Sequence, residues 1–171
     1  PQSFDSLLKY WLEPEIYSLR LLDRLSDFLK KSVLKEPFPV HLKLETGMNR
    51  LGFGTDLTDE LVLRLKKEKE ISIRSVFSHL AASEEAQHDD FTRWQIEQFN
   101  IERKKITDAF SAPATPIMSH ILNSSGVMRF PEAQMDMVRL GIGLYGVSLV
   151  EERQKELQNV AVLKTTVSQI K

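Results

Sequence analysis

The apolar positions of this chain follow two periods, and stretches of one period alternate with stretches of the other. Apolar residues recur three or four positions apart in the longer stretches, which predicts helices, whereas short alternating or continuously apolar runs predict buried strands. The predicted helices cover residues 4–12, 18–31, 58–65, 89–106 and 127–130, and the predicted strands cover residues 15–17, 39–45, 71–77, 117–118 and 137–146.

Strands and helices succeed one another with short connections up to residue 146, which predicts a parallel sheet with helices outside it. Five strands are too few for a closed eight-stranded barrel, which needs about 250 residues. We therefore predict an α/β fold in which residues 1–150 form a partial TIM (β/α) barrel. A charged run and alternating valines then predict that residues 151–171 are a linker and the first strand, at 158–171, of a truncated β-domain.

Single residues give finer expectations for three of the helices. Ser18 and Thr58 each precede an apolar periodic stretch and are expected to cap the helices that follow. The long helix is expected to begin at Asp89 or Asp90. The side chains expected to face inward from it are Phe91, Trp94, Ile96, Phe99 and Ile106.

Unusual polar residues follow the predicted strands. Arg50 lies between two glycines after the second strand, His79 follows the third, Asn123 and Ser124 follow the fourth, and Arg139 lies at the end of the fifth. The carboxyl ends of the strands of a parallel barrel share one face, where catalytic groups gather. The sequence therefore predicts a functional site that combines these residues.

Composition excludes several classes of function. A net charge of -1 and a pI near 6.5 give no electrostatic footprint for nucleic acid or an acidic membrane surface. The absence of cysteine excludes disulfides and thiolate chemistry. No apolar run reaches the roughly 18 residues of a membrane span, and the first residues lack the pattern of a secretory leader. We also expect no metal site.

Four strings in the chain resemble the signatures of the alanine racemases, which are enzymes that depend on pyridoxal 5'-phosphate (PLP). The strings occur in the order of that family and cover nearly the whole chain. The resemblance implies that residues 1–150 are the C-terminal part of a PLP-binding (β/α)8 barrel, strands about four to eight. The strings are Lys43-Leu-Glu-Thr-Gly-Met-Asn-Arg50, Phe77-Ser-His79-Leu-Ala-Ala-Ser83, His120-Ile-Leu-Asn-Ser124 and Arg139-Leu-Gly-Ile-Gly-Leu-Tyr-Gly146.

The resemblance also implies roles for single residues. Arg50 matches the arginine that binds the phenolic oxygen of PLP, His79 matches the histidine beside the pyridine ring, and Arg139 matches the arginine that faces the pyridine nitrogen. Lys43 matches a lysine that is carbamylated in many members, and its carbamate holds the first arginine in place. The residues that match the phosphate-binding group are Asn123, Ser124, Gly141 and Ile142.

Two catalytic residues of the family lie in sequence motifs that do not occur in this chain. These are the Schiff-base lysine of the first barrel strand and the catalytic tyrosine of the β-domain, so these 171 residues alone are expected to be inactive. A small departure is Glu45, where the family usually has aspartate. The resemblance implies a homodimeric isomerase of the bacterial cytoplasm that interconverts L- and D-alanine, with D-alanine used for peptidoglycan in the cell wall.

Simpler interpretations of the same residues stay open. By spacing alone, Lys43 is a strand lysine whose stem packs and whose ammonium group is solvated, and Asn123 and Ser124 form a capped turn. His120 is interpreted as structural, and no role is assigned to His41. Tyr145 is expected to pack near the site. Alternative functions are a non-catalytic PLP-binding module, a racemase or decarboxylase of the same fold acting on another amino acid, or an inert structural fragment.

Overall fold

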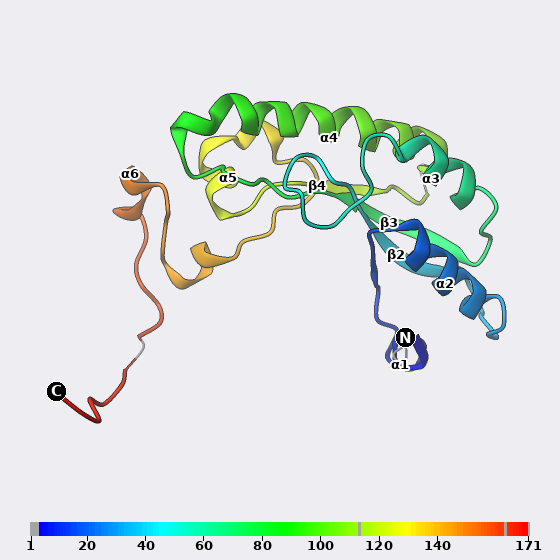
Figure 1. Ribbon diagram of the computed structural model, residues 1–171, viewed down its shortest axis with the longest axis horizontal. Coiled ribbons are helices and arrows are strands. Elements are labelled where there is room, and N and C mark those ends of the chain that lie inside the picture. The colour runs from blue at the N-terminus through cyan, green and yellow to red at the C-terminus, as the bar shows by residue number, and fades with distance from the viewer. Residues whose placement is uncertain (1–3, 113, 163, 171) are drawn as a thin grey trace.

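The computed structural model describes residues 4–112, 114–162 and 164–170. Four parallel strands form one sheet in the order β1-β2-β3-β4, so each strand lies beside its neighbour in the sequence (Figure 1). This order needs a crossover between every pair of strands, and helices supply most of it. The strands are β1 (Glu15–Ile16), β2 (Phe38–Lys43), β3 (Ile71–Phe77) and β4 (Met118–His120).

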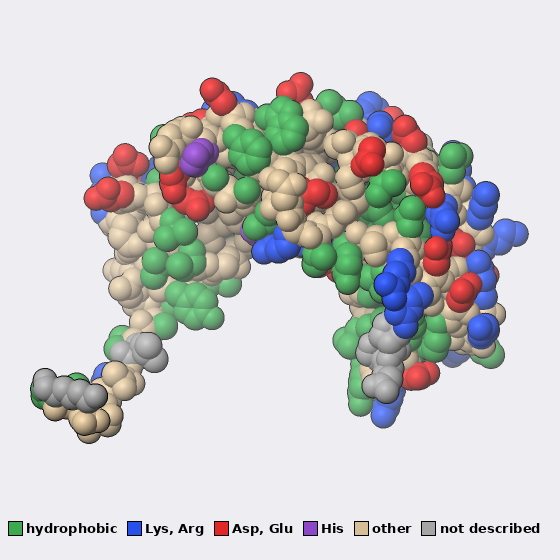
Figure 2. All heavy atoms as spheres, in the orientation of Figure 1, with side chains coloured by type: hydrophobic (Ala, Val, Ile, Leu, Met, Phe, Trp, Pro, Cys, Tyr) green, Lys and Arg blue, Asp and Glu red, His purple; other side chains and the backbone are tan. Residues whose placement is uncertain are grey.

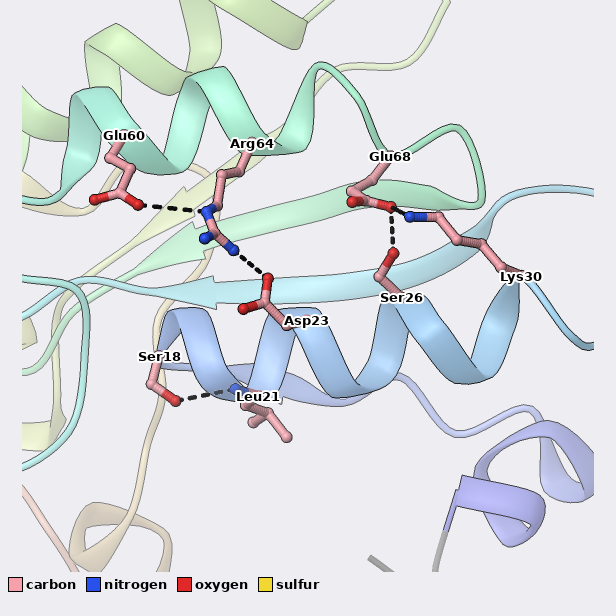
Figure 3. Close-up of polar contacts among 8 residues, drawn as sticks. All are labelled: Ser18, Leu21, Asp23, Ser26, Lys30, Glu60, Arg64 and Glu68. Carbon is pink, nitrogen blue, oxygen red and sulfur yellow. Dashed lines mark hydrogen bonds and ion pairs between the residues drawn. The ribbon is translucent and has the colours of Figure 1, made fainter.

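The helices α2 (Leu19–Leu29), α3 (Thr58–Leu65) and α4 (Asp89–Phe110) form a layer on one face of this sheet (Figure 1). Ion pairs join consecutive helices of the layer: Arg64 pairs with Asp23, and Lys30 lies 2.8 Å from Glu68 (Figure 3). The helices are α1 (Phe4–Tyr10), α2 (Leu19–Leu29), α3 (Thr58–Leu65), α4 (Asp89–Phe110), α5 (Ser124–Arg129) and α6 (Glu151–Gln154), with short 3-10 turns at Ala86–His88, Pro131–Ala133 and Ile142–Tyr145.

The apolar core lies between the helix layer and the sheet. Val40, Leu42 and Val76 of the sheet are fully buried there. Leu22, Leu25 and Leu29 of α2 and Phe99 and Ile106 of α4 are 1% exposed or less and belong to the same cluster. Burial of this kind is worth about 1.5–3 kcal/mol for each large apolar side chain, so it dominates the stability of the fold.

The opposite face of the sheet is concave and polar. Side chains alternate along a strand, so the neighbours of the core residues point away from the helices. The strand register places His41 beside Ser75 and Phe77 beside His120. Figure 2 shows the hollow on this side of the molecule, with basic side chains gathered at its middle. The sheet therefore offers a polar inner face to a site.

The α/β fold with parallel strands that the sequence predicts is confirmed, but the fifth strand is wrong. Residues 137–146 form an irregular segment and the turn Ile142–Tyr145, and Gly146 has a φ of +75°. Ile142, Leu144 and Tyr145 are 41%, 63% and 60% exposed, so Tyr145 does not pack near the site as expected. The neighbouring β4 is only 3 residues long and offers little edge for another strand.

The strand predicted at 158–171 is also absent from the described part of this segment. Residues 158–162 and 164–170 form neither a helix nor a strand, and Leu163 and Lys171 lie outside the described residues. Val160, Val162 and Val167 are 73%, 79% and 71% exposed. Alternating valines form a strand when a partner strand supplies a ladder of hydrogen bonds and an apolar face. Here the Val160 N–H donates to Tyr145 O at 3.2 Å, but the valine side chains are exposed.

Two of the finer expectations about helices are wrong, and two are confirmed. The long helix α4 begins at Asp89, as expected. Ser18 caps α2 by accepting the N–H of Leu21 at 3.3 Å (Figure 3). Thr58 is the first residue of α3, because Leu57 takes the cap position. Phe91 and Trp94, which were expected to face inward, are 38% and 45% exposed and stack on each other with ring centroids 5.7 Å apart.

No helix within the described ranges has the length and apolarity needed to cross a bilayer.

Candidate functional site

The carboxyl ends of β2, β3 and β4 lie at one edge of the sheet, and the polar residues expected from the sequence follow them. Arg50 comes after β2, His79 directly after β3, and Ser124 after β4. Arg139 arrives at this edge from the irregular segment, held by a backbone hydrogen bond from its N–H to Leu122 O at 3.0 Å. It therefore reaches the expected place without a strand of its own.

Arg139 ties the ends of β3 and β4 together. Its Nη2 donates to Ser78 O at 2.5 Å and lies 3.2 Å from His79 Nδ1. Its Nη1 donates to His120 Nδ1, and its guanidinium lies over the ring of Phe77, 5.2 Å from the centroid. Burial lowers the pKa of Arg139 and the Glu15 carboxylate opposes that shift, so the guanidinium stays charged at neutral pH.

His120 has a closer relation to the site than the sequence suggested. It is 3% exposed, stacks on Phe77 with centroids 5.0 Å apart, and accepts from Arg139. The interpretation of His120 as structural missed this contact with a charged site residue. The sequence did carry a signal for this role of His120, because each of three successive strands has a polar residue on its inner face. These residues are His41, Ser75 and His120.

Both imidazoles in the site are neutral at physiological pH. Burial lowers the pKa of His79 to about 4, and the charges of Arg139, Arg50 and Lys43 act in the same direction. Burial and Arg139 also lower the pKa of His120 to about 4. The effect of Arg50 on His79 places its charge within electrostatic reach of this group, although Arg50 itself is exposed.

These pKa values predict a loss of stability in mild acid. A histidine has a pKa of about 6.5 in the unfolded chain, so between pH 6.5 and about 4 the unfolded state binds the proton more readily. The free energy of unfolding should therefore fall as pH drops through this window, by at most about 1.4 kcal/mol per histidine for each step of one in pH. His79 is only partly buried, which reduces its contribution to this loss of stability.

Urea unfolding of the wild type and of His79→Asn at pH 7.0, 6.0 and 5.0 measures this loss. The variant should show a shallower dependence on pH, because it lacks one of the two groups. His88→Asn is the matched control, since His88 is exposed at a side-chain fraction of 47%. Equal pH dependence in all three proteins would show that His79 is not held neutral by the fold.

The loop that carries Arg50 is organised by Glu45. The Glu45 carboxylate accepts the backbone N–H groups of Gly47 at 2.5 Å and of Arg50 at 3.2 Å. Burial alone would raise the pKa of Glu45, but the backbone N–H groups of residues 47–50 outweigh it and hold the pKa below its usual value. The longer side chain at this position therefore acts as an anionic cap for the loop.

Lys43 lies at the end of β2 beneath the site. It is 8% exposed, and its Nζ lies 3.0 Å from Glu15 Oε1 and 5.6 Å from the centroid of the Phe77 ring. The unmodified amine thus has an anionic partner in this structure. Carbamylation of Lys43 stays a prediction from the family resemblance.

Ser124 is the centre of a second polar cluster. Its Oγ accepts the backbone N–H of Gly141 at 2.9 Å and of Gly143 at 3.1 Å. Asn123 caps α5, because its Oδ1 accepts the N–H of Gly126 at 2.8 Å. Ile142 lies between the two glycines and is 41% exposed. In this structure the two N–H groups converge on the Ser124 hydroxyl, and an anion that replaced this hydroxyl as their acceptor would meet a suitable donor set.

A parallel sheet with helices on one face and its charged groups at the carboxyl ends of the strands defines a protein of the (β/α)-barrel class, here with an open sheet. Within that class the family is also clear. The chain belongs to the alanine racemases, whose N-terminal domain family matches residues 1–149.

Individual relatives agree with this assignment. The alanine racemase of Carboxydothermus hydrogenoformans is 34% identical over an alignment of 177 residues, gaps included, which covers 100% of this chain and 45% of that protein. A solved alanine racemase of Clostridium difficile 630 in complex with cycloserine is 29% identical with a TM-score of 0.74, over 86% of this chain and 39% of that one.

A third relative shares the fold. The solved alanine racemase of Bartonella henselae, which has covalently bound pyridoxal phosphate, is 23% identical with a TM-score of 0.69, over 87% of this chain and 38% of that one. The chain spans less than half the length of the curated relatives it matches.

Proposed function

We propose that this chain is the cofactor-binding barrel portion of an alanine racemase, an isomerase that interconverts L- and D-alanine with PLP. Family membership supports the proposal, and one observation of the site carries it. Arg139 is a partly buried cation that forms no ion pair with the described residues and has a neutral imidazole on either side. A cation held without an anionic partner suits a site that receives an electron-rich ligand.

The residues present fit PLP. When bound, PLP supplies an electron sink for negative charge at Cα of the amino acid. Arg139 would face the pyridine nitrogen and disfavour its protonation, because like charges would meet. This restrains the electron sink and limits the chemistry to removal and return of a proton at Cα. His79 would lie beside the ring as a neutral group.

The other ends of the cofactor also have matching groups. Arg50 would bind the anionic phenolic oxygen with its planar fork of donors. The cluster of Ser124, Gly141 and Ile142 would bind the phosphate, with backbone N–H groups that already turn toward Ser124 Oγ. Asn123 would act indirectly, because its side chain is used to cap α5. The two clusters together account for both anionic ends of PLP.

The proposal extends to the whole protein. We infer that it works as a homodimer in the cytoplasm on free alanine, without nucleic-acid or membrane partners. The relatives are more than twice as long as this chain, and the resemblance places the Schiff-base lysine and the catalytic tyrosine in segments outside it. These 171 residues alone are expected to be inactive.

The test uses the complete polypeptide that carries these residues together with the segments its relatives have. Purified with PLP, it should convert L-alanine to a mixture of L- and D-alanine, followed by chiral chromatography. Serine and glutamate serve as competing substrates, because a relative of the same fold could act on another amino acid. A protein that binds PLP but leaves the configuration of alanine unchanged would contradict the proposal and favour a binding module.

A further inference from the structure

A continuous row of hydrogen bonds leads from Arg139 across the inner face of the sheet to the carboxylate of Glu13. We call the side chains of this row the inner-face network. Its links are Arg139 Nη1 to His120 Nδ1, His120 Nε2 to Ser75 Oγ at 3.2 Å, Ser75 Oγ to His41 Nδ1 at 2.7 Å, and His41 Nε2 to Glu13 Oε2 at 2.9 Å.

The direction of the first links follows from Arg139. A guanidinium can only donate, so Nδ1 of His120 accepts and carries no proton. A neutral imidazole has one protonated nitrogen, so the proton of His120 lies on Nε2 and is donated to Ser75 Oγ. Burial and Arg139 lower the pKa of His120 to about 4, which agrees with a neutral ring.

The direction continues to the far end. Ser75 has one hydroxyl proton and already accepts from His120, so it donates that proton to His41 Nδ1. His41 then carries its own proton on Nε2 and donates it to Glu13. A doubly protonated His41 would donate to Ser75 as well, and the Ser75 hydroxyl would lose its acceptor in the network. All four bonds thus point from a cation toward an anion.

We propose that Ser75, His41 and Glu13 are positioning residues that hold His120, and through it the guanidinium of Arg139. Ser75 is fully buried and His120 is 3% exposed, so the bond between them lies in a medium of low polarity where aligned hydrogen bonds strengthen one another. Arg74 Nε lies 3.6 Å from Glu13 Oε1, which places a second cation beside the far end of the network. This inference deepens the proposed function and rests on it for its purpose, but not for its test.

The first test reads the direction of the hydrogen bonds in cofactor-free complete polypeptide. With 15N-labelled histidine, long-range proton–nitrogen NMR reports which ring nitrogen carries the proton. Leucine variants of His41 and His120 assign the signals. The single proton of the His120 ring should lie on Nε2, and Nδ1 of His41 should carry no proton, because it accepts from Ser75. A proton on Nδ1 of either ring would overturn the proposed direction.

The second test measures whether Ser75 acts on Arg139 from a distance, since the described residues show no direct contact between these two side chains. A double-mutant cycle combines Ser75→Ala with Arg139→Lys in urea unfolding of the cofactor-free protein. The effect of Arg139→Lys on the unfolding equilibrium constant should shrink about fivefold or more in the Ser75→Ala background. Ser119→Ala is the matched control, a serine of β4 that is 2% exposed and whose hydroxyl lies outside the network.

Ser119→Ala should leave the effect of Arg139→Lys unchanged within about twofold, as for independent sites. If Ser75→Ala also leaves it unchanged, Ser75 only fills space and the proposal is overturned. If Ser75→Ala does not fold, His41 carries the test. Asparagine at His41 keeps an acceptor for Ser75 and should preserve most of the coupling, whereas leucine should abolish it. Equal coupling in His41→Asn and His41→Leu would reject the network.

These measurements do not depend on the reaction. Coupling without alanine racemisation would leave the inner-face network intact and reject only the proposed function. Racemisation without coupling would do the reverse. A functional readout then links them: if the network positions Arg139 for catalysis, Ser75→Ala should lower kcat about tenfold with little change in the KM for alanine.

Discussion

Replacing Gly52 with alanine is expected to lower the free energy of unfolding by about 3 kcal/mol or more, because strain and overpacking act together. Gly52 has a φ of +140°, a conformation that a side chain makes costly. A Cβ at this position would lie 2.5 Å from the backbone nitrogen of Glu45 and 2.6 Å from the carbonyl carbon of Leu44. Both are backbone atoms at the end of β2 and cannot move aside without breaking the loop.

The effect should reach the site, since this loop presents Arg50. The backbone N–H of Glu45 donates a hydrogen bond to Phe53 O at 2.8 Å. The Glu45 carboxylate accepts the N–H groups of Gly47 and Arg50, which precede Gly52. Urea unfolding measures the stability. Gly54→Ala is the matched control, because a Cβ there meets only the flexible carboxylate of Asp56. Similar losses in Gly52→Ala and Gly54→Ala would show that the loop adapts and that the glycine is dispensable.

The sequence sufficed for the parts of the fold that depend on local pattern. The positions of β2, β3, α2 and α4 were predicted from local pattern, and in α2 the buried residues Leu22, Leu25, Ser26 and Leu29 recur at the helical period. The placement of Arg50, His79 and Ser124 after strands also followed from the sequence. In a parallel sheet, the end of each strand falls at the same edge, so an order along the chain becomes a position in space.

Tertiary context decided the elements that the sequence got wrong. Residues 137–146 have the apolar alternation of a strand, but glycines interrupt it and β4 offers an edge of only 3 residues. Phe91 and Trp94 have helical spacing and were expected inside, yet they cover the loop at Gly47, where a Cβ would lie 3.0 and 2.9 Å from their rings. A loop packed over a helix leaves no periodic signal in the sequence.

The inner-face network could not be predicted from the sequence, for a different reason. His41, Ser75 and His120 are far apart along the chain and meet only through the register of three strands. That register includes an irregularity between Val40 and His41, which aligns His41 with Ser75 rather than with Arg74. A single shifted pairing would break the row of hydrogen bonds, and no local pattern encodes the shift.

Replacing Arg139 with lysine is expected to lower the kcat of alanine racemisation by about a hundredfold or more in the complete protein. The charge is kept, so the change isolates the planar fork. Arg139 reaches Ser78 O, His79 Nδ1 and His120 Nδ1 with two nitrogens, and a single ammonium cannot serve all three. Loss of about two hydrogen bonds from a charged donor is worth roughly 3–6 kcal/mol, or a factor of 100 or more in rate.

The matched control is Arg129→Lys, since Arg129 is another partly buried arginine with two partners. Its Nη1 donates to Ser83 O at 2.9 Å and its Nη2 lies 2.6 Å from Asp89 Oδ1, away from Arg139. Arg129→Lys should also lower the free energy of unfolding, by about 1–3 kcal/mol for one lost hydrogen bond from a charged donor, but change kcat less than threefold. Equal losses of kcat in the two variants would mean that the fork of Arg139 serves only the fold. A selective loss in Arg139→Lys would show that the orientation of this one cation, beyond its charge, is what the reaction requires.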